Sequence, residues 1–362
     1  MMAKKKTAPE MGREGGIMAY GYDEQEYRPL RGRALEEVKA FLARQGLTWE
    51  ADVTYTVLLR DSTGRLAATA SLQEDVIKCV AVAEDLRGEG LTATVLTAVR
   101  REALSRGKRR LFLYTKPENR LQFTSLGFYE VARTDRVLLM EDRKEGFAAW
   151  AESLRRNDAA GTIGAVVLNA NPMTLGHRYL IEEAARRCDF LYLLVVSEDK
   201  SAVPAADRQA LVAAATADLA HTAVAGTDRY LVSSATFPAY FLKEKADAGA
   251  VWTDLDVAVF LRLSKTLGIT RRFVGSEPFC PVTAAYNKAM AAALPKGGVE
   301  LIELPRMARG DVPVSATAVR QLLKEGRWQE IRPLVPEAVW TYFSREENRK
   351  TVLERMEEAN RS

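Results

Sequence analysis

The clearest hydrophobic pattern in the chain is an apolar run at residues 163–168 that is followed, after a polar loop, by an amphipathic stretch. The run is short, β-branched and almost free of polar side chains, which is typical of a strand buried on both faces of a parallel sheet. After Gly176 the apolar positions recur at helical spacing and the opposite face is charged. Residues 169–177 therefore join the end of a strand to the start of a helix, where α/β sheets bind ligands and free N–H groups favour a phosphate.

The alternation of strand-like and helix-like patterns continues to about residue 345. Apolar runs predict strands at 190–197, 230–234, 273–275 and 301–304, and amphipathic stretches predict helices at 205–219, 238–246 and 255–267. Such alternation predicts an α/β fold with a parallel, doubly wound sheet and right-handed crossovers. Residues 336–362 predict a helix with a charged end.

The first half of the chain has a different pattern. Its residues predict a helix at 34–45, strands at 55–59, 66–72, 76–82 and 111–115, and an alanine- and leucine-rich helix that ends near Gly107. We therefore expect a disordered tail at residues 1–17, an α+β domain at 18–142, a helical connector at 143–161, a second domain at 162–345 and a C-terminal helix end at 346–362.

Composition limits the classes of protein that fit. With 362 residues, 47% hydrophobic and 28% charged, the chain has the balance of a globular protein with two ordinary domains. A formal charge of +4 is small for this length and indicates no nucleic-acid partner. The apolar runs are too short to span a bilayer, so no membrane partner is expected, and the N-terminus lacks the apolar core of a signal peptide. The three cysteines are far apart and odd in number, which favours a reducing cytoplasm.

The loop before the predicted helix ends in Thr174-Leu175-Gly176-His177, which contains one of the two histidines of the chain. Gly176 lets a ligand approach the backbone, His177 can donate to a phosphate oxygen and Thr174 offers a hydroxyl. Alternatively, His177 is an ordinary residue at a helix start, but the strand, loop and helix around it favour phosphate binding. The segment resembles the H-x-G-H signature of Rossmann-like, HIGH-type nucleotidylyltransferases. The resemblance implies that Thr174 and His177 are catalytic and stabilise charge on a nucleotide α-phosphate.

A second motif, Val314-Ser315-Ala316-Thr317-Ala318-Val319-Arg320, lies far downstream. It resembles the I-S-S-T-x-x-R motif of the same superfamily, in which hydroxyls and an arginine at a helix start hold the triphosphate. The resemblance implies that Ser315 and Thr317 bind the nucleotide and that Arg320 is catalytic, since an arginine suits a phosphate. The alternatives are that Ser315 only caps a helix and that Arg320 is a solvated charge.

Other candidates for the nucleotide site have weaker signals. Gly275, Ser276 and Glu277 follow a predicted strand and could line an adenine pocket, although a plain turn fits equally well. Lys200 or Arg208 could neutralise departing pyrophosphate, although each is also consistent with a surface charge.

The first domain carries a Gly-x-Gly loop, Gly88 and Gly90, before its alanine-rich helix, and a Leu-Gly-Phe turn at 126–128. With the order of its strands and helices, these features resemble the acetyl-CoA-dependent GNAT N-acetyltransferases. In that family the loop binds the pyrophosphate of CoA, although Asp85 stands where the family has glutamine or arginine. A tight turn is the alternative interpretation of the two glycines.

Residues 169–172, 176–181, 235–238 and 273–280, together with the GNAT-like first half, resemble the citrate lyase ligase family over about residues 18–345. The resemblance implies an enzyme that uses ATP and nucleotide-bound Mg²⁺ to convert acetate to acetyl-adenylate. The implied enzyme would then acetylate the prosthetic-group thiol of the acyl-carrier subunit of citrate lyase. Asn169 and Asn171 would belong to the ATP site, and Gly88 and Gly90 would bind the prosthetic group, which is a dephospho-CoA derivative.

Two other functions fit the same motifs. One is an adenylyltransferase with a different acceptor, because the motifs specify α-phosphate chemistry but not the nucleophile. The other is an acetyl-CoA-dependent acetyltransferase or CoA-binding module, in which the second domain serves as a docking platform.

Overall fold

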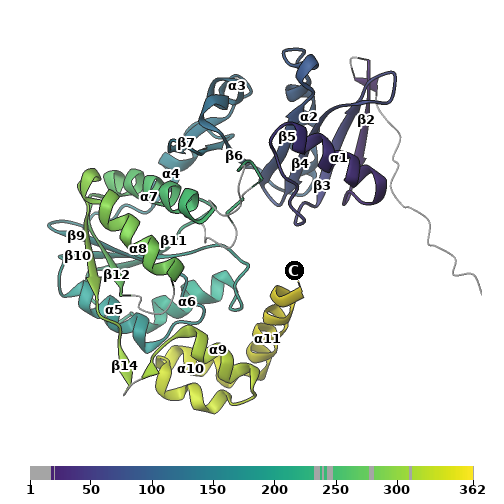
Figure 1. The fold of residues 1–362 in the computed structure, drawn as a ribbon. Helices are drawn as coiled ribbons and strands as arrows, with labels where there is room; N and C mark the ends of the chain where they lie inside the picture. Colours follow the sequence, from purple (N-terminus) through teal and green to yellow (C-terminus); the bar gives the residue numbers. More distant parts are fainter. Residues whose placement is uncertain are drawn as a thin grey trace, which may run out of the picture. The chain divides into compact units, whose positions relative to one another are not determined.

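The computed structural model describes residues 18–19, 21–231, 237–238, 240–242, 248–276, 281–309 and 312–361. The predicted tail at 1–17, residues 235–236 and residues 277–280, which include the candidate Glu277, lie outside the described residues. The chain forms two compact units (Figure 1). Unit 1 contains the residues up to Lys144 together with Pro238–Ala248, and unit 2 contains Glu145–Phe237 and the chain from Gly249 onward.

Unit 1 is an α+β fold around a mixed sheet with strand order β1-β2-β3-β4-β5-β6-β8-β7. Its strands are β1 (Met18–Ala19), β2 (Tyr22–Tyr27), β3 (Tyr55–Arg60), β4 (Leu66–Gln73), β5 (Val76–Val82), β6 (Phe112–Thr115), β7 (Tyr129–Arg133) and β8 (Leu138–Glu141). Its helices are α1 (Gly32–Arg44), η1 (Glu84–Leu86), α2 (Leu91–Ser105), η2 (Pro117–Asn119) and α3 (Arg120–Ser125).

The core of unit 1 lies between α2 and the sheet. Val95 and Val99 of α2 are fully buried and belong to one cluster with Val57 of β3 and Ala70 of β4. Burial of this apolar helix face makes the main contribution to the free energy that holds α2 on the strands. The helix start is consequently fixed beside the end of β5, where the Gly-x-Gly loop lies.

The parallel strands β5 and β6 diverge soon after they meet. Within the described part of unit 1, only Val76 with Phe112 and Ile77 with Leu113 pair these two strands. On its other edge β5 stays paired with β4 as far as Val82. The β6-facing backbone of the second half of β5 is therefore released from the ladder and opens a gap in the sheet.

Unit 2 is built on a parallel sheet with strand order β11-β10-β9-β12-β13, which confirms the predicted doubly wound α/β class. Its strands are β9 (Ile163–Leu168), β10 (Phe190–Val195), β11 (Thr222–Gly226), β12 (Ile269–Gly275) and β13 (Glu300–Leu304), with a small hairpin of β14 (Ala308–Arg309) and β15 (Val312–Pro313). Its helices are α4 (Gly146–Ser153), α5 (Leu175–Ala185), α6 (Ala205–Ala215), α7 (Ala248–Leu267), α8 (Pro281–Ala293), η4 (Pro295–Gly297), α9 (Ala316–Lys324), η5 (Trp328–Leu334), α10 (Glu337–Ser344) and α11 (Glu346–Arg361).

Two adjacent residues of β12 show how helices cover both faces of this sheet. Phe273 is buried in a cluster with Ile181 of α5. The guanidinium of Arg272 lies 4.3 Å from the ring centroid of Phe260 in α7 and donates to the hydroxyl of Tyr286 in α8 at 2.7 Å. Because successive strand residues point to opposite faces, α5 covers one face of the sheet and α7 and α8 cover the other (Figure 1).

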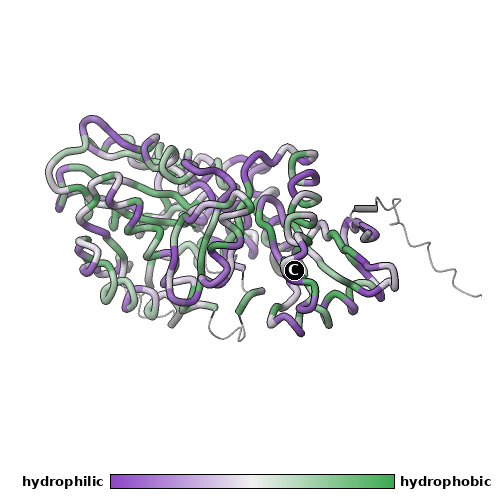
Figure 2. The backbone as a smooth tube through the Cα atoms, turned by 90° about the horizontal axis from the view of Figure 1, so that it is seen from above, coloured by the Kyte–Doolittle hydropathy of each residue, from purple (hydrophilic) through white to green (hydrophobic). Residues whose placement is uncertain are grey.

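The hydropathy pattern that predicted these elements is visible along the backbone. Figure 2 shows hydrophobic and hydrophilic stretches alternating along the backbone. Strand β10 is buried at every position, as expected for a central strand covered on both faces. Among the described residues, no helix is long and apolar enough to cross a membrane.

Two elements that were predicted for the second domain are wrong where the structure describes them. Tyr230 and Leu231 lie in a turn and a bend rather than in a strand, and the strand that pairs with β10 is β11. The search for apolar runs missed β11 because this edge strand consists of small residues whose burial alternates. The predicted helix at 238–246 is also wrong for Tyr240–Leu242, since Tyr240 and Phe241 form a turn and Leu242 is irregular.

Candidate functional site

The loop between β9 and α5 is organised by a reciprocal cap between Thr174 and His177. The backbone N–H of Thr174 donates to Nδ1 of His177 at 3.0 Å, and the backbone N–H of His177 donates to the Thr174 hydroxyl at 3.4 Å. Thr174 is only 1% exposed, and its hydroxyl also lies 2.9 Å from Nδ1 of His177. This arrangement satisfies N–H groups that a helix start otherwise leaves unpaired. It also assigns Thr174 a capping contact, so its predicted catalytic role stays a prediction.

The same cap determines which nitrogen of His177 carries the proton. Because Nδ1 accepts a backbone N–H, the neutral ring carries its proton on Nε2. Burial, and then repulsion from Arg306, lowers the pKa of His177 from 6.5 to about 4. At neutral pH the side chain is therefore an uncharged hydrogen-bond donor through Nε2.

Gly176 brings the two sequence motifs into contact. A Cβ built on Gly176 would lie 2.8 Å from the carbonyl oxygen of Val314, which is closer than real Cβ atoms approach. Val314 immediately precedes Ser315, the N-cap of α9. Glycine is therefore needed at 176 because the start of α5 packs directly on the backbone that leads into α9.

Arg320 links the second motif to the first. Its Nη1 donates to the backbone carbonyl of Asn171 at 2.5 Å, and its Nη2 donates to the hydroxyl of Thr317 at 3.2 Å. Ser315 caps α9 by accepting the backbone N–H of Ala318 at 3.2 Å. Burial lowers the pKa of Arg320 from its ordinary value. Residues 149 positions apart in sequence thus meet at one edge of the unit 2 sheet.

Arg208 has a different environment from the one expected for a residue that binds pyrophosphate. It is 0% exposed, and burial lowers its pKa. Its guanidinium donates to the carbonyl of Val203 at 3.1 Å, to that of Val196 at 2.7 Å and to that of Glu198. It also donates to the backbone and side-chain oxygens of Asn169 at 2.8 and 2.6 Å. Arg208 therefore holds together the loops at the ends of β9 and β10, and its predicted contact with pyrophosphate stays a prediction.

The two candidate asparagines take part in the same loop network. Oδ1 of Asn169 accepts from the hydroxyl of Ser201 at 3.2 Å as well as from Arg208. Oδ1 of Asn171 accepts the backbone N–H of Val203 at 2.9 Å. The side chains of both asparagines fix loop geometry, and their contact with a nucleotide remains a prediction.

Gly275 and Ser276 lie at the carboxyl end of β12, as predicted from the sequence. The backbone N–H of Ser276 donates to the carbonyl of Leu304 at 2.7 Å, and the Ser276 hydroxyl accepts the backbone N–H of Arg306 at 3.2 Å. A Cβ on Gly275 would meet no atom of the described residues within 4 Å. The space beside Gly275 is therefore open, whereas Ser276 is fixed by the segment after β13.

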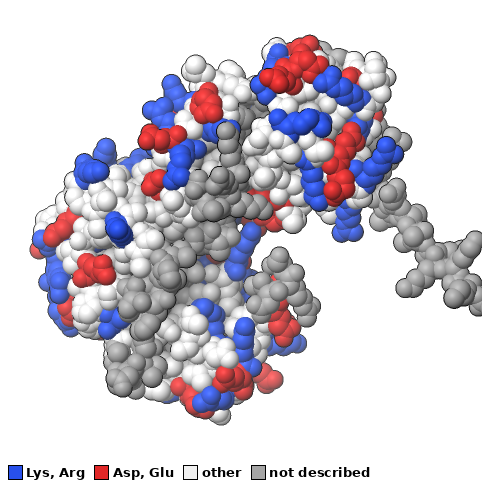
Figure 3. All heavy atoms as spheres, viewed as in Figure 1, with Lys and Arg blue, Asp and Glu red and all other residues white. Residues whose placement is uncertain are grey.

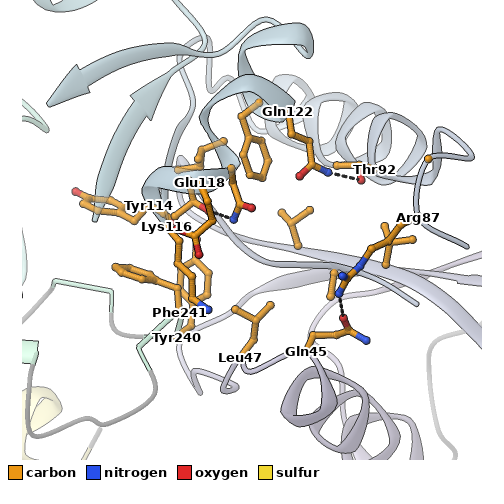
Figure 4. A pocket seen from close by; sticks show the side chains of 18 residues that line it. Gln45, Leu47, Arg87, Thr92, Tyr114, Lys116, Glu118, Gln122, Tyr240 and Phe241 are labelled. Atoms are coloured by element: carbon orange, nitrogen blue, oxygen red, sulfur yellow. Dashed lines mark hydrogen bonds between the residues drawn. The ribbon is translucent and has the colours of Figure 1, made fainter. Parts of the chain in front are cut away.

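Unit 1 contains a second candidate site, a pocket of about 560 Å³ at the gap between β5 and β6 (Figure 4). This volume is typical of a small-molecule site. Gly88 lines the pocket with φ of +91°, and Gly90, with φ of +80°, is the N-cap of α2. Both glycines thus adopt backbone conformations that other residues rarely do.

The charges around this pocket include residues that sequence reasoning missed. Asp85 pairs with Arg65 at 2.6 Å, so its negative charge has a partner. Arg87 lines the pocket and donates to Oε1 of Gln45 at 2.6 Å, and Lys116 lines the other end (Figure 4). Arg87 immediately precedes Gly88, so the glycine motif could have indicated it as a candidate. No local motif indicates Lys116.

Charge is otherwise evenly mixed over the visible surface. Figure 3 shows Lys and Arg interspersed with Asp and Glu on the described residues, in agreement with the small net charge. Among the described residues, no group of three or more His, Cys, Asp or Glu side chains is placed to hold a metal ion. Cys79 and Cys188 are free thiols whose pKa values are raised by burial.

Comparison with known families divides the chain in the same way as the motifs. The family model described as "Citrate lyase ligase C-terminal domain" matches residues 163–343, and "Acetyltransferase (GNAT) family" matches residues 25–131. A citrate (pro-3S)-lyase ligase of Escherichia coli K12 is 39% identical over 320 residues, covering 86% of this chain and 90% of that protein. A protein of the same name from Klebsiella pneumoniae is 38% identical and covers 85% and 92%.

Solved structures show weaker, partial similarity. Thermotoga maritima TmcAL bound with alpha-thio ATP is 14% identical with a TM-score of 0.35, covering 55% of this chain and 56% of that one. Escherichia coli ElaA is 16% identical with a TM-score of 0.30, covering 34% of this chain and 99% of that one.

Proposed function

Because the chain belongs to the citrate lyase ligase family, we propose that this enzyme activates acetate with ATP and acetylates the prosthetic-group thiol of the citrate lyase acyl-carrier subunit. The observation that carries the proposal is the junction of the two phosphate-type motifs in unit 2. There His177, with its Nε2–H donor, and Arg320 lie in α5 and α9, and the beginnings of these two helices are in contact through Gly176 and Val314.

In the proposed first step, a carboxylate oxygen of acetate attacks the α-phosphorus of ATP. The bond between that phosphorus and the oxygen bridging to the β-phosphate breaks, so that acetyl-adenylate forms and pyrophosphate leaves. This transfer needs donors and positioning rather than a protein nucleophile. His177 would donate from Nε2 to an α-phosphate oxygen, and Arg320 would stabilise charge on the phosphates.

In the proposed second step, the sulfur of the prosthetic-group thiol, after losing its proton, attacks the acetyl carbonyl carbon. The carbon–oxygen bond to the phosphate breaks, which gives the thioester and AMP. Mg²⁺ would be carried on the nucleotide phosphates with water as its other ligands, as is usual for this ion.

We place the CoA-like prosthetic arm in the pocket of unit 1. The pocket has the volume of a small-molecule site, and its Gly88 and Gly90 loop opens α2 in the manner of an anion-binding helix start. Arg87 supplies positive charge for a diphosphate. The partner of Asp85 is Arg65, so the unusual acidic residue in this loop is compatible with an anionic ligand.

The test is mass spectrometry of deacetylated citrate lyase carrier protein after incubation with this enzyme, ATP, Mg²⁺ and acetate. The expected result is the mass gain of one acetyl group on the prosthetic thiol, together with AMP and pyrophosphate. Omission of ATP or acetate should abolish the gain. A gain that needs only acetyl-CoA would instead support an acetyltransferase.

Acetate-dependent exchange of pyrophosphate into ATP separates the proposal from an adenylyltransferase with another acceptor. The first step alone predicts exchange when acetate is present and the carrier is absent. No exchange with acetate, but exchange with a pantetheine or nicotinamide phosphate, would contradict the ligase.

A further inference from the structure

The pocket of unit 1 is completed by a short segment that comes from far along the chain. Tyr240 and Phe241 lie between β11 and α7 in sequence, yet they belong to unit 1 and line its pocket. Tyr240 is 5% exposed and Phe241 is 2% exposed. Their rings meet edge to face, with centroids 5.4 Å apart.

Hydrogen bonds fix Tyr240 across the gap in the sheet. Its hydroxyl donates to the carbonyl of Tyr114 in β6 and lies 3.4 Å from the carbonyl of Ile77 in β5. Its own carbonyl accepts the backbone N–H of Thr48 at 2.8 Å. Burial raises the pKa of Tyr240 well above its ordinary value, so the hydroxyl keeps its proton at neutral pH. The ring is thus held at the point where the two strands separate.

The pocket therefore has two chemically different ends. Figure 4 shows Arg87 and Gln45 at one end. At the opposite end it shows the rings of Tyr240, Phe241 and Tyr114, with Lys116 and Glu118 beside them. An anionic group suits the end with Arg87 and the start of α2. The β5 backbone at 80–82 lies between the two ends and, facing the gap, can accept an extended, amide-bearing chain.

We propose that Tyr240 and Phe241 close the inner end of this pocket and determine the size of the group that a CoA-like arm can carry on its sulfur. The inference rests on the proposed binding of such an arm by unit 1. With the anionic part of the arm beside Arg87, the sulfur end points toward the two buried rings. The space between the sulfur and these rings accommodates a free thiol but not a long S-acyl chain.

The proposal predicts a preference that binding measurements on the whole chain can detect. Isothermal titration calorimetry with CoA, acetyl-CoA and hexanoyl-CoA should give the tightest binding for the short sulfur substituents. A closed apolar wall typically discriminates single methylene groups by about tenfold or more. We expect CoA to bind at least about tenfold more tightly than hexanoyl-CoA.

Substitutions at the wall then identify its cause. Tyr240→Ala should remove most of the preference for CoA over hexanoyl-CoA, because it shortens the wall. Tyr240→Phe keeps the ring and should keep the preference, although it loses the hydroxyl bond to Tyr114. Tyr129→Ala, at an exposed tyrosine outside the pocket lining, is the matched control and should change neither affinity.

Several results would overturn the inference. An unchanged ratio of affinities in folded Tyr240→Ala, or equal binding of CoA and hexanoyl-CoA by the unmodified chain, would do so. If circular dichroism shows that Tyr240→Ala is unfolded, Phe241→Leu takes its place under the same criterion. Failure of the chain to bind any CoA probe also rejects the inference, whereas acetate-dependent pyrophosphate exchange would still report separately on the proposed function.

Discussion

The backbone N–H of Thr174 donates to Nδ1 of His177, with 3.0 Å between the two nitrogens. This contact orients the imidazole at the start of α5 and keeps its proton on Nε2. A donor that is fixed before the substrate arrives does not need to reorganise during the reaction, which is how enzymes stabilise developing charge. The contact therefore connects a helix cap to the proposed chemistry.

Substitution of His177 can separate the cap from the donor. Asparagine retains an oxygen near the position of Nδ1 but nothing at that of Nε2, whereas the amide nitrogen of glutamine reaches the position of Nε2. We expect His177→Asn to reduce acetate-dependent pyrophosphate exchange by about 10²- to 10³-fold, as for the loss of one charge-stabilising donor. We expect His177→Gln to retain more activity. Full activity in a folded His177→Asn enzyme would rule out the donor role.

The lowered pKa of His177 predicts how activity and stability depend on pH. Its pKa is about 4 in the folded chain and 6.5 without the shift, so below pH 6.5 the unfolded state binds a proton that the folded state does not. The free energy of unfolding should therefore decrease as pH falls from about 6.5 to about 4. Urea titrations of the unmodified chain and His177→Gln should diverge in this window. Pyrophosphate exchange should show no inflection from His177 near pH 6.5, and an inflection that disappears in His177→Gln would contradict the shift.

Gly176 and Gly275 form a matched pair for testing the contact between the motifs. Gly176→Ala places a methyl group 2.8 Å from the backbone oxygen of Val314, which cannot rotate away. We expect a loss of about 1–3 kcal/mol in the free energy of unfolding and a higher KM for ATP. The methyl group of Gly275→Ala meets no described atom within 4 Å, so its effect on stability should be below about 1 kcal/mol. Equal stabilities of the two variants in urea unfolding would refute the steric explanation.

The contribution of Arg208 to stability should depend on the hydrogen bonds of its guanidinium and not on its positive charge alone. Its replacement by lysine removes the planar fork and leaves buried carbonyls unpaired, each at a cost of about 1–3 kcal/mol. We expect Arg208→Lys to lower the unfolding free energy by at least about 2 kcal/mol. Arg186→Met, at an exposed ion pair with Glu183, should cost less than about 1 kcal/mol. Wild-type stability together with a raised KM for ATP in Arg208→Lys would restore the phosphate-binding interpretation.

Gly88 and Gly107 allow a test of the unit 1 pocket. Both have positive φ and open space around them, but only Gly88 lines the pocket, because Gly107 follows the other end of α2. We expect Gly88→Trp to weaken binding of the carrier protein by tenfold or more, on the order of the loss of one good contact. Gly107→Trp should carry a similar backbone penalty without this loss. Unchanged affinity for the carrier in Gly88→Trp, measured by surface plasmon resonance, would exclude the pocket as the binding site.

Local patterns in the sequence predicted the parts of the fold that depend on local chemistry. The buried strand β9, the cap at Ser315 and the glycine loop before α2 follow from apolar runs, capping residues and tight turns, so they were accessible without the structure. Strand β11 was missed because its small residues are selected by its edge position and not by strong apolar burial.

Contacts between distant residues were not accessible from local patterns. The sequence indicated that Gly176 serves ligand approach, but its steric partner, the Val314 carbonyl, comes from another element. Arg208 has the sequence appearance of a surface charge, and its burial depends on the loops after β9 and β10 meeting around it. Such roles arise from tertiary packing, which propensity and spacing do not encode.

The placement of Tyr240 has a consequence for how the chain can be divided. A fragment that ends at Lys144 would contain every described strand of unit 1 but would lack the hydroxyl that spans β5 and β6 and the aromatic wall of the pocket. The GNAT-like portion is therefore not an interchangeable cassette. Grafting it onto another protein, or deleting the 240–241 segment from the second half, would alter a cavity whose remaining walls are untouched.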